Sequence, residues 1–264
     1  MRILLTNDDG YGAEGLEVLR QIAEELSSEV WIIAPEANQS GASHSMTLHE
    51  PLRLRQLDER TFVIRGTPTD CVIMGVRHLM LKEPPDLILS GVNHGSNLAE
   101  DVTYSGTIAA AIEGTLLGIR SIAMSQTGGS IGEGTIYWTT PLTHGPGIVS
   151  KLLATGWPTG IVINVNYPPR APQEVTGIEV TRQGRRDQAL LHIDKRNDPW
   201  GTPYFWFGFE RPPSRIVQGT DLGAIDEGRI SITPLCLNLT DDPTCKALQS
   251  AFPSAKPGKS TKRV

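Results

Sequence analysis

The stretch ILLTNDDG, residues 3–10, passes from a short apolar run to two adjacent carboxylates, Asp8 and Asp9. A run this short that is apolar throughout predicts a strand buried on both faces. Residues 12–27 repeat leucine and alanine at helical spacing and predict an amphipathic helix with its charged side outward. The two carboxylates are therefore expected where the first strand ends and the first helix is about to begin.

The alternation of buried strand and helix continues along much of the chain. Apolar runs predict further strands at residues 30–34, 86–90, 121–125 and 161–165. Helices are predicted for a segment capped by Thr69 or a neighbour, and for the alanine-rich residues 106–117. Strands that are apolar on both faces and separated by helices predict an α/β fold, with a mostly parallel sheet and helices on both sides.

Two regions depart from this alternation. Residues 48–65 alternate polar and apolar side chains and predict a β-hairpin insertion. From about residue 175 to 235 we expect an excursion, which begins with an antiparallel strand at 175–180 and contains the aromatic stretch DPWGTPYFWFGFERPP at 198–213. These aromatic side chains fit either an oligomer contact or a small local core. Residues 229–233 are expected to return to the body of the fold.

The chain of 264 residues is expected to form one domain over residues 1–240, followed by a C-terminal helix and a disordered tail over 241–264. The net charge of −5 argues against a nucleic-acid polymer as partner. No apolar run is long enough to cross a bilayer and no secretion leader is visible, so we expect a cytoplasmic protein without a membrane partner. The three cysteines lack zinc or disulfide spacing and are expected to be reduced thiols.

The carboxylates Asp8 and Asp9 have two interpretations. A single aspartate after a strand often caps the next helix, because its oxygens accept bonds from free helix amides. A second carboxylate beside it in a partly desolvated crevice raises the free energy of both charged groups, and a bound cation removes that penalty. Oxygen ligands suit a hard ion such as Mg²⁺ or Mn²⁺. The pair therefore favours a metal site somewhat over a cap.

Further oxygen ligands are expected at other strand ends, because parallel strands present their carboxyl ends at one edge of the sheet. Ser40, in the stretch APEANQSGAS (34–43), could donate a hydroxyl oxygen, although the stretch alone fits a plain turn. Asn93, in SGVNHGSN (90–97), offers an amide oxygen, and Asn97 adds a polar contact nearby. Such a set leaves positions on the cation for water or phosphate.

The stretch YSGT, residues 104–107, opens the alanine-rich helix. Ser105 could serve only as its cap. Alternatively, Gly106 lets an anion approach the backbone, and the free amides at the helix start attract phosphate. No nucleoside-triphosphate P-loop and no dinucleotide-binding glycine fingerprint is present.

Taken together, these segments resemble the SurE family, the bacterial survival-protein phosphatases. The matching stretches are TNDDG (6–10), APEANQSGAS (34–43), GTPTDCV (66–72), SGVNHGSN (90–97), DVTYSGTIAAAIEG (101–114), DPWGTPYFW (198–206) and ISITPL (230–235). The resemblance runs from Met1 to about Leu237. One departure is visible: the family usually has glycine where Ala99 stands, which bears on the backbone geometry after Asn97.

The resemblance implies a metal-dependent 5'-nucleotidase, a phosphomonoesterase acting on nucleoside 5'-monophosphates and also on 3'-monophosphates and some short polyphosphates. It implies a Rossmann-like three-layer αβα sandwich with a C-terminal hairpin exchanged between subunits of a homodimer or homotetramer. The family's ligands for one divalent ion, Mg²⁺ or Mn²⁺, fall on Asp8, Asp9, Ser40 and Asn93, where Asp8 and Asp9 are also the catalytic acids. Its phosphate-binding residues fall on Ser105, Gly106 and Thr107, and Asn97 joins them.

Other mechanisms and classes are compatible with parts of this pattern. Asp8 could attack phosphorus directly, as in haloacid-dehalogenase phosphatases, although those carry their second acid two residues on. Zinc deacetylases with paired acids need a histidine where Asn7 stands, and receiver domains need a carboxylate in the region of Ser90 and Asn93. The non-enzymatic alternative is a protein that senses nucleotides without hydrolysing them. Tyr104 or an aromatic residue of the excursion is the candidate for stacking on the base.

Overall fold

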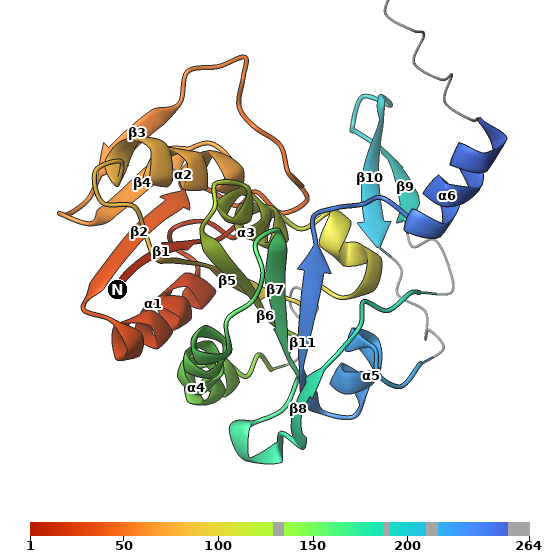
Figure 1. The fold of residues 1–264 in the computed structure, drawn as a ribbon. Helices are drawn as coiled ribbons and strands as arrows, with labels where there is room; N and C mark the ends of the chain where they lie inside the picture. Colours follow the sequence, from red (N-terminus) through yellow and green to blue (C-terminus); the bar gives the residue numbers. More distant parts are fainter. Residues whose placement is uncertain (129–134, 187–190, 210–215, 253–264) are drawn as a thin grey trace, which may run out of the picture.

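The computed structural model describes residues 1–128, 135–186, 191–209 and 216–252. Within these residues the fold is built on a twisted sheet of nine strands in the order β3-β4-β2-β1-β5-β6-β7-β11-β8 (Figure 1). The strands are β1 (Arg2–Thr6), β2 (Glu29–Pro35), β3 (Arg53–Gln56), β4 (Thr61–Arg65), β5 (Leu87–His94), β6 (Arg120–Gln126), β7 (Ile161–Tyr167), β8 (Gly177–Val180) and β11 (Arg229–Cys236). Neighbouring strands from β4 to β7 pair in parallel, so the α/β architecture expected from the sequence is confirmed.

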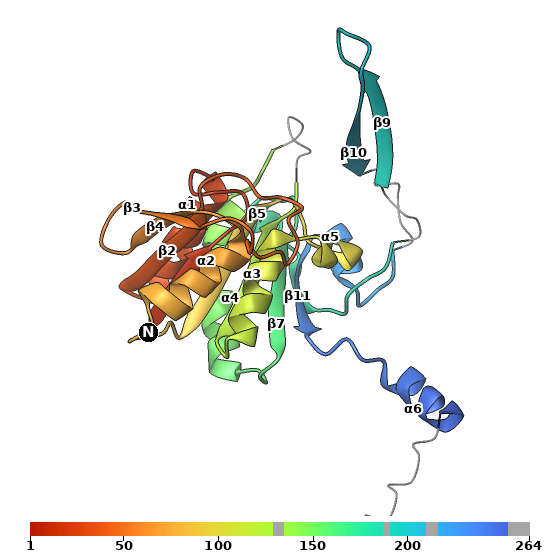
Figure 2. The same cartoon turned by 90° about the horizontal axis from the view of Figure 1, so that it is seen from above.

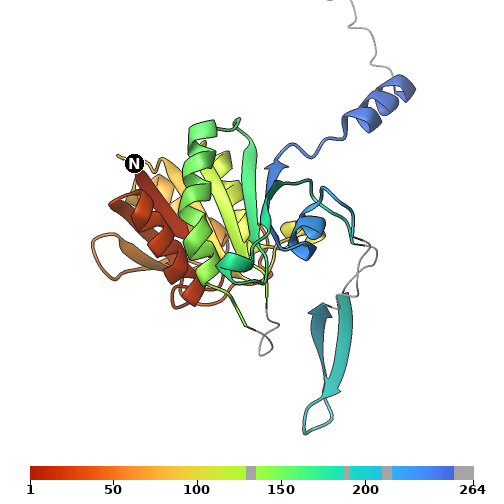
Figure 3. The same cartoon turned by 90° about the horizontal axis from the view of Figure 1, so that it is seen from below.

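Helices cover both faces of the sheet and complete three layers. One face carries α1 (Glu14–Leu26) and α4 (Thr139–Thr155), which lie in front of the sheet in Figure 3. The other carries α2 (Pro68–Met74), continued by the helical turn η1 (Gly75–Leu79), and α3 (Gly106–Leu116), both seen in Figure 2. Alternate residues of β1 serve the two cores: Ile3 and Leu5 pack toward α1 and α4, and Leu4 packs toward α2.

Local sequence signals explain where two of these helices begin. Thr67 and Asp70 form a capping box at the start of α2, in which each side chain accepts a bond from the other residue's backbone N–H. The expected cap of this helix is therefore a neighbour of Thr69. Ser105 caps α3 through a bond from Ile108 N to its hydroxyl oxygen. Both helices thus start at fixed residues next to the carboxyl ends of strands.

The strand pairings differ from the sequence-based expectation in two places. The hairpin predicted at 48–65 is present as β3 and β4, but β4 also pairs in parallel with β2 and so extends the main sheet. The strand at 175–180 was expected to pair in antiparallel fashion, and this is wrong, because β8 pairs in parallel with β11. The chain between them passes through the excursion and α5 (Asp221–Asp226) and re-enters the sheet in the same direction. The antiparallel partner of β11 is β7.

Two segments project from this body. Strands β9 (Leu191–Asn197) and β10 (Pro203–Phe209) form an antiparallel pair, called here the ribbon, which stands clear of the sheet in Figure 2. Helix α6 (Asp242–Ala251) also lies apart from the sheet. The expected disordered tail at 253–264, and residues 210–213 of the aromatic stretch, lie outside the described residues. No helix in the described part of the chain combines the length and the hydrophobicity required to cross a bilayer.

Candidate active site

A cavity of about 200 Å³ opens at the carboxyl ends of the parallel strands. Five of the eight residues expected from the sequence line it: Asp8, Ser40, Asn93, Asn97 and Ser105. They come from the ends of β1, β2 and β5, from the loop after β5, and from the start of α3. The structure thus brings together segments that lie far apart in sequence, at the edge where ligands of open α/β sheets bind.

Asp8 is the most enclosed of these groups, with 4% of its surface exposed. The hydroxyl of Thr107 donates to Asp8 Oδ1, and Gly106 lies against the same side chain. Burial raises the pKa of Asp8 to about 6, against the lowering effect of the Thr107 bond and with a further rise from the charge of Asp9. The carboxylate is therefore desolvated and held in one orientation. A nearby positive charge would stabilise its ionised form.

Asp9 is held between two loops. Its carboxylate accepts a bond from His94 N at 3.0 Å and another from Asn38 Nδ2 at 3.4 Å. Burial raises the pKa of Asp9, while the His94 N–H lowers it. Two adjacent acids with raised pKa values form an environment that a divalent cation stabilises.

The loop after β2 is tied to β1 by its backbone. Gln39 N donates to Asp8 O at 2.7 Å, and Ser40 N donates to Asn38 Oδ1 at 2.8 Å. These bonds hold the exposed Ser40 at the cavity, beside Asp8.

Asn93 reaches the cavity through an irregularity in β5. The pairing of β5 with β6 shifts register between Ser90 and Asn93, as a β-bulge does. Gly91 permits this shift, because a Cβ at its φ of +131° would lie 2.2 Å from Met124 O. The side-chain nitrogen of Asn93 donates to Gly95 O at 2.9 Å, so its amide oxygen is the end suited to a cation.

Asn97 is fixed by a group of buried side chains that sequence reasoning missed. Its backbone N–H donates to Asn166 Oδ1 at 2.9 Å, and its side chain donates to Ser125 Oγ at 2.9 Å. Its carbonyl oxygen accepts from the side chains of Asn164 and Asn166. The signal was present in β7, where two asparagines alternate within the apolar run IVINVNY and therefore share one face of the sheet.

The remaining phosphate-binding candidates lie at the start of α3. Ser105 caps the helix by accepting a bond through its hydroxyl oxygen, and it also lines the cavity. Its hydroxyl proton remains available to donate to a ligand. The hydroxyl of Thr107 is fully buried and engaged with Asp8. What Gly106 and Thr107 can offer an anion is their backbone N–H groups, which belong to the first helical turn and have no helical acceptor.

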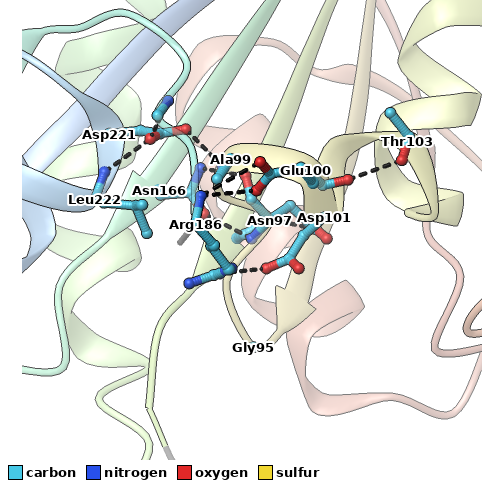
Figure 4. Close-up of polar contacts among 12 residues, drawn as sticks. Gly95, Asn97, Ala99, Glu100, Asp101, Thr103, Asn166, Arg186, Asp221 and Leu222 are labelled. Atoms are coloured by element: carbon cyan, nitrogen blue, oxygen red, sulfur yellow. Dashed lines mark hydrogen bonds and ion pairs between the residues drawn. The ribbon is translucent and has the colours of Figure 1, made fainter. Parts of the chain in front are cut away.

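The loop that carries Asn97 continues through Ala99, which adopts a φ of +51°. This left-handed conformation favours glycine and explains the glycine usual at this position in the family that the sequence resembles. Ala99 N donates to Asp221 Oδ2 at 2.9 Å, which holds the strained residue in place (Figure 4). Ala99 therefore keeps a left-handed backbone conformation with the support of Asp221.

The donor set suits a hard divalent cation. Among the described residues, no three histidine, cysteine, aspartate or glutamate side chains gather in the way a metal ion requires. A cation held by Asp8 and Asp9 would therefore also need the hydroxyl of Ser40 and the amide oxygen of Asn93. Carboxylate, hydroxyl and amide oxygens are ligands that Mg²⁺ and Mn²⁺ accept, so the residues present fit such an ion.

A parallel sheet with a polar cavity at its strand ends, paired acids and an adjoining helix start defines an α/β protein whose candidate ligand site lies at the carboxyl edge of the sheet. The chain belongs to the SurE family: residues 3–189 match the family model described as "Survival protein SurE".

Relatives and a solved structure agree with this assignment over nearly the whole chain. The chain is 55% identical to "5'-nucleotidase SurE" of Methylorubrum extorquens over 96% of this chain and 99% of the relative. It is 57% identical to the protein of the same name from Methylobacterium radiotolerans, with the same coverage. The crystal structure of the SurE protein from Aquifex aeolicus is 40% identical and superposes with a TM-score of 0.82, covering 96% of this chain and all of that one.

Proposed function

We propose that this chain is a 5'-nucleotidase that hydrolyses nucleoside 5'-monophosphates to nucleoside and phosphate, with one divalent cation, Mg²⁺ or Mn²⁺, per subunit. The relatives named 5'-nucleotidase support the reaction. The observation that carries the metal dependence is the pair Asp8 and Asp9, two adjacent acids whose pKa values burial raises beside the start of α3.

In this proposal Asp8, Asp9, Ser40 and Asn93 hold the cation. When bound, the cation supplies a positive charge that polarises the phosphoryl group and increases the acidity of a bound water. The backbone N–H groups of Gly106 and Thr107 and the side chains of Asn97 and Ser105 bind phosphate oxygens and stabilise the charge that develops on them. The Thr107 hydroxyl orients Asp8.

The size of the cavity bears on the range of substrates. A space of about 200 Å³ suits a phosphoryl group and leaves the nucleoside outside. We therefore propose that the enzyme also accepts nucleoside 3'-monophosphates and short polyphosphates, because the enclosed part of each is the same group. Tyr104, which lines the rim and is 57% exposed, is the residue best placed to stack on a base.

Phosphate release from nucleoside 5'- and 3'-monophosphates and from tripolyphosphate, with Mg²⁺, with Mn²⁺ and with excess chelator, tests this function. We expect release that requires the metal and stops on chelation. Binding of nucleotide by the metal-loaded protein without release of phosphate would contradict hydrolysis and establish a nucleotide sensor.

We also propose that the chain forms a homo-oligomer through the ribbon, as a homodimer or homotetramer. A two-stranded ribbon alone is marginally stable in water. This one exposes large apolar side chains on both faces, including Trp206 at 60% and Phe207 at 71%, with Trp200 at 88% in its turn. A second copy of the chain would cover them.

All three cysteines are free, which supports a reducing compartment such as the cytoplasm.

The double substitution Trp206→Glu and Phe207→Glu places a charge on each face of the ribbon. We expect it to lower the oligomeric state, measured by light scattering after size-exclusion chromatography, because burying an unpaired charge opposes association. Leu81→Glu, a replacement of a 62% exposed side chain between η1 and β5, is the matched control and should leave the mass unchanged. An unchanged mass for the double variant would refute assembly through the ribbon.

A further inference from the structure

The cavity at the strand ends is lined by a second carboxylate besides Asp8. Asp101 lines the cavity together with Asp8, Asn97 and Ser105. It belongs to the helical turn η2 (Ala99–Thr103), and its neighbour Glu100 adds a second acid to the same turn. An unbalanced negative charge at this position would repel a phosphate dianion.

The charge of Asp101 is matched by a cation from a distant part of the chain. Arg186 Nη2 lies 2.7 Å from Asp101 Oδ2, and the two side chains are only 10% and 12% exposed (Figure 4). Arg186 N also donates to the carboxylate of Glu100, at 3.1 and 3.3 Å. Because the ion pair is largely shielded from water, the Coulomb attraction between its two charges is greater than in a surface pair. Losing one partner leaves a poorly solvated charge.

The segment that carries Arg186 is fixed to the cavity loop independently of this ion pair. Asp221 is fully buried and its carboxylate accepts bonds from Ala99 N at 2.9 Å and Gly184 N at 2.7 Å. Gln183 Nε2 donates to Ala99 O at 2.9 Å. Arg186 is therefore held within two residues of a backbone anchor, and its guanidinium has a defined position relative to Asp101.

We propose that Arg186 is a positioning residue for phosphate binding: it fixes Asp101 and neutralises its charge at the wall of the cavity, so that the cavity accepts a phosphate dianion. The proposal rests on the proposed function. In the resulting distribution of charge, the divalent cation balances Asp8 and Asp9, and Arg186 balances Asp101. Asp8 and Asp101, the two carboxylates that line the cavity among the described residues, then each have a cationic partner.

Steady-state kinetics with a nucleoside 5'-monophosphate, and inhibition by orthophosphate, test the proposal in the full-length, metal-loaded protein. Arg186→Met should raise KM and the inhibition constant of orthophosphate about tenfold while changing kcat less than about threefold. Adding Asp101→Asn should return both constants to near the wild-type values, because the charge that Arg186 neutralised is then absent. Asp101→Asn alone should tighten orthophosphate binding, since it leaves Arg186 unbalanced.

Arg229→Met is the matched control, because Arg229 forms ion pairs with Glu179 and Glu227 and does not line the cavity. It should leave both constants unchanged. Wild-type constants in Arg186→Met would overturn the proposal, as would a loss that Asp101→Asn does not restore, since that pattern indicates a purely structural role. If Arg186→Met does not fold, Asp101→Asn alone decides, and unchanged or weaker orthophosphate binding refutes the proposal.

Failure of the proposed function has a different signature. A wild-type protein that releases no phosphate refutes the nucleotidase reaction. In that case, calorimetry on the same Mn²⁺-loaded variants compares their affinities for orthophosphate. This comparison still tests the role of Arg186 in phosphate binding.

Discussion

Asp8→Asn is expected to abolish phosphate release, with kcat at least about a thousandfold below wild type. The asparagine keeps the shape of the side chain and can still accept the bond from the Thr107 hydroxyl. It removes one of the two negative charges that would hold the cation. Release of phosphate in a coupled assay and binding of Mn²⁺ by calorimetry measure the two losses.

The same substitution should stabilise the metal-free protein at neutral pH. Burial raises the pKa of Asp8 from 3.8 to about 6, so the folded state favours the protonated form. The corresponding stability is present below pH 4 and is lost as the pH rises through 6, which costs up to about 3 kcal/mol at pH 7.5. Asp8→Asn escapes this cost, so its unfolding free energy without metal should exceed that of wild type at pH 7.5, and the difference should fall below about 1 kcal/mol at pH 4.

Asp226→Asn is the control, because it removes an exposed carboxylate at the end of α5. It should change neither activity nor the pH dependence of stability. Full activity in Asp8→Asn would contradict the proposed site. A phosphate group found on Asp8 after acid quenching of the wild-type reaction would show that Asp8 attacks phosphorus directly, in place of a water.

Gly106→Ala is expected to lower kcat about a hundredfold and to destabilise the fold by about 1 to 3 kcal/mol. An added Cβ would lie 2.7 Å from Asp8 Cβ and 3.0 Å from Asp8 Oδ2. Both groups are buried, so either the carboxylate or the start of α3 has to move. Activity assays and denaturant unfolding measure the two effects.

Gly147→Ala provides the matched control. Gly147 is an exposed residue of α4, and an added Cβ there meets no atom within 4 Å. The alanine should stabilise the helix by about 0.5 to 1 kcal/mol and leave the kinetics unchanged. If Gly106→Ala behaved like Gly147→Ala, the close packing between Asp8 and the start of α3 would be irrelevant to catalysis.

The sequence predicted those parts of the site that follow from the direction of parallel strands. Asp8, Ser40, Asn93 and Ser105 each stand at a strand end or a helix start, so their convergence required only the sheet. The contacts of Arg186 and Asp221 could not be predicted, because they join residues 85 and 122 positions apart and no local pattern encodes them.

The strand at 175–180 was mispredicted for a related reason. A short run with alternating side chains indicates a strand, but the direction of its pairing depends on where the chain has gone before it returns. Thr107 shows the same limit at the level of one side chain. The family resemblance implied a phosphate contact for Thr107 but did not show that its hydroxyl donates to Asp8.

Asn97 is held on its backbone N–H, its side chain and its carbonyl oxygen by residues of the central sheet. A loop held by these bonds is ordered when the protein folds, so the entropy cost of ordering it is part of folding. Ligand binding then adds little further cost for ordering this loop. We therefore expect a ligand that contacts Asn97 to bind without ordering this part of the loop. Differences among nucleotides should accordingly appear in their rates of dissociation rather than in their rates of association.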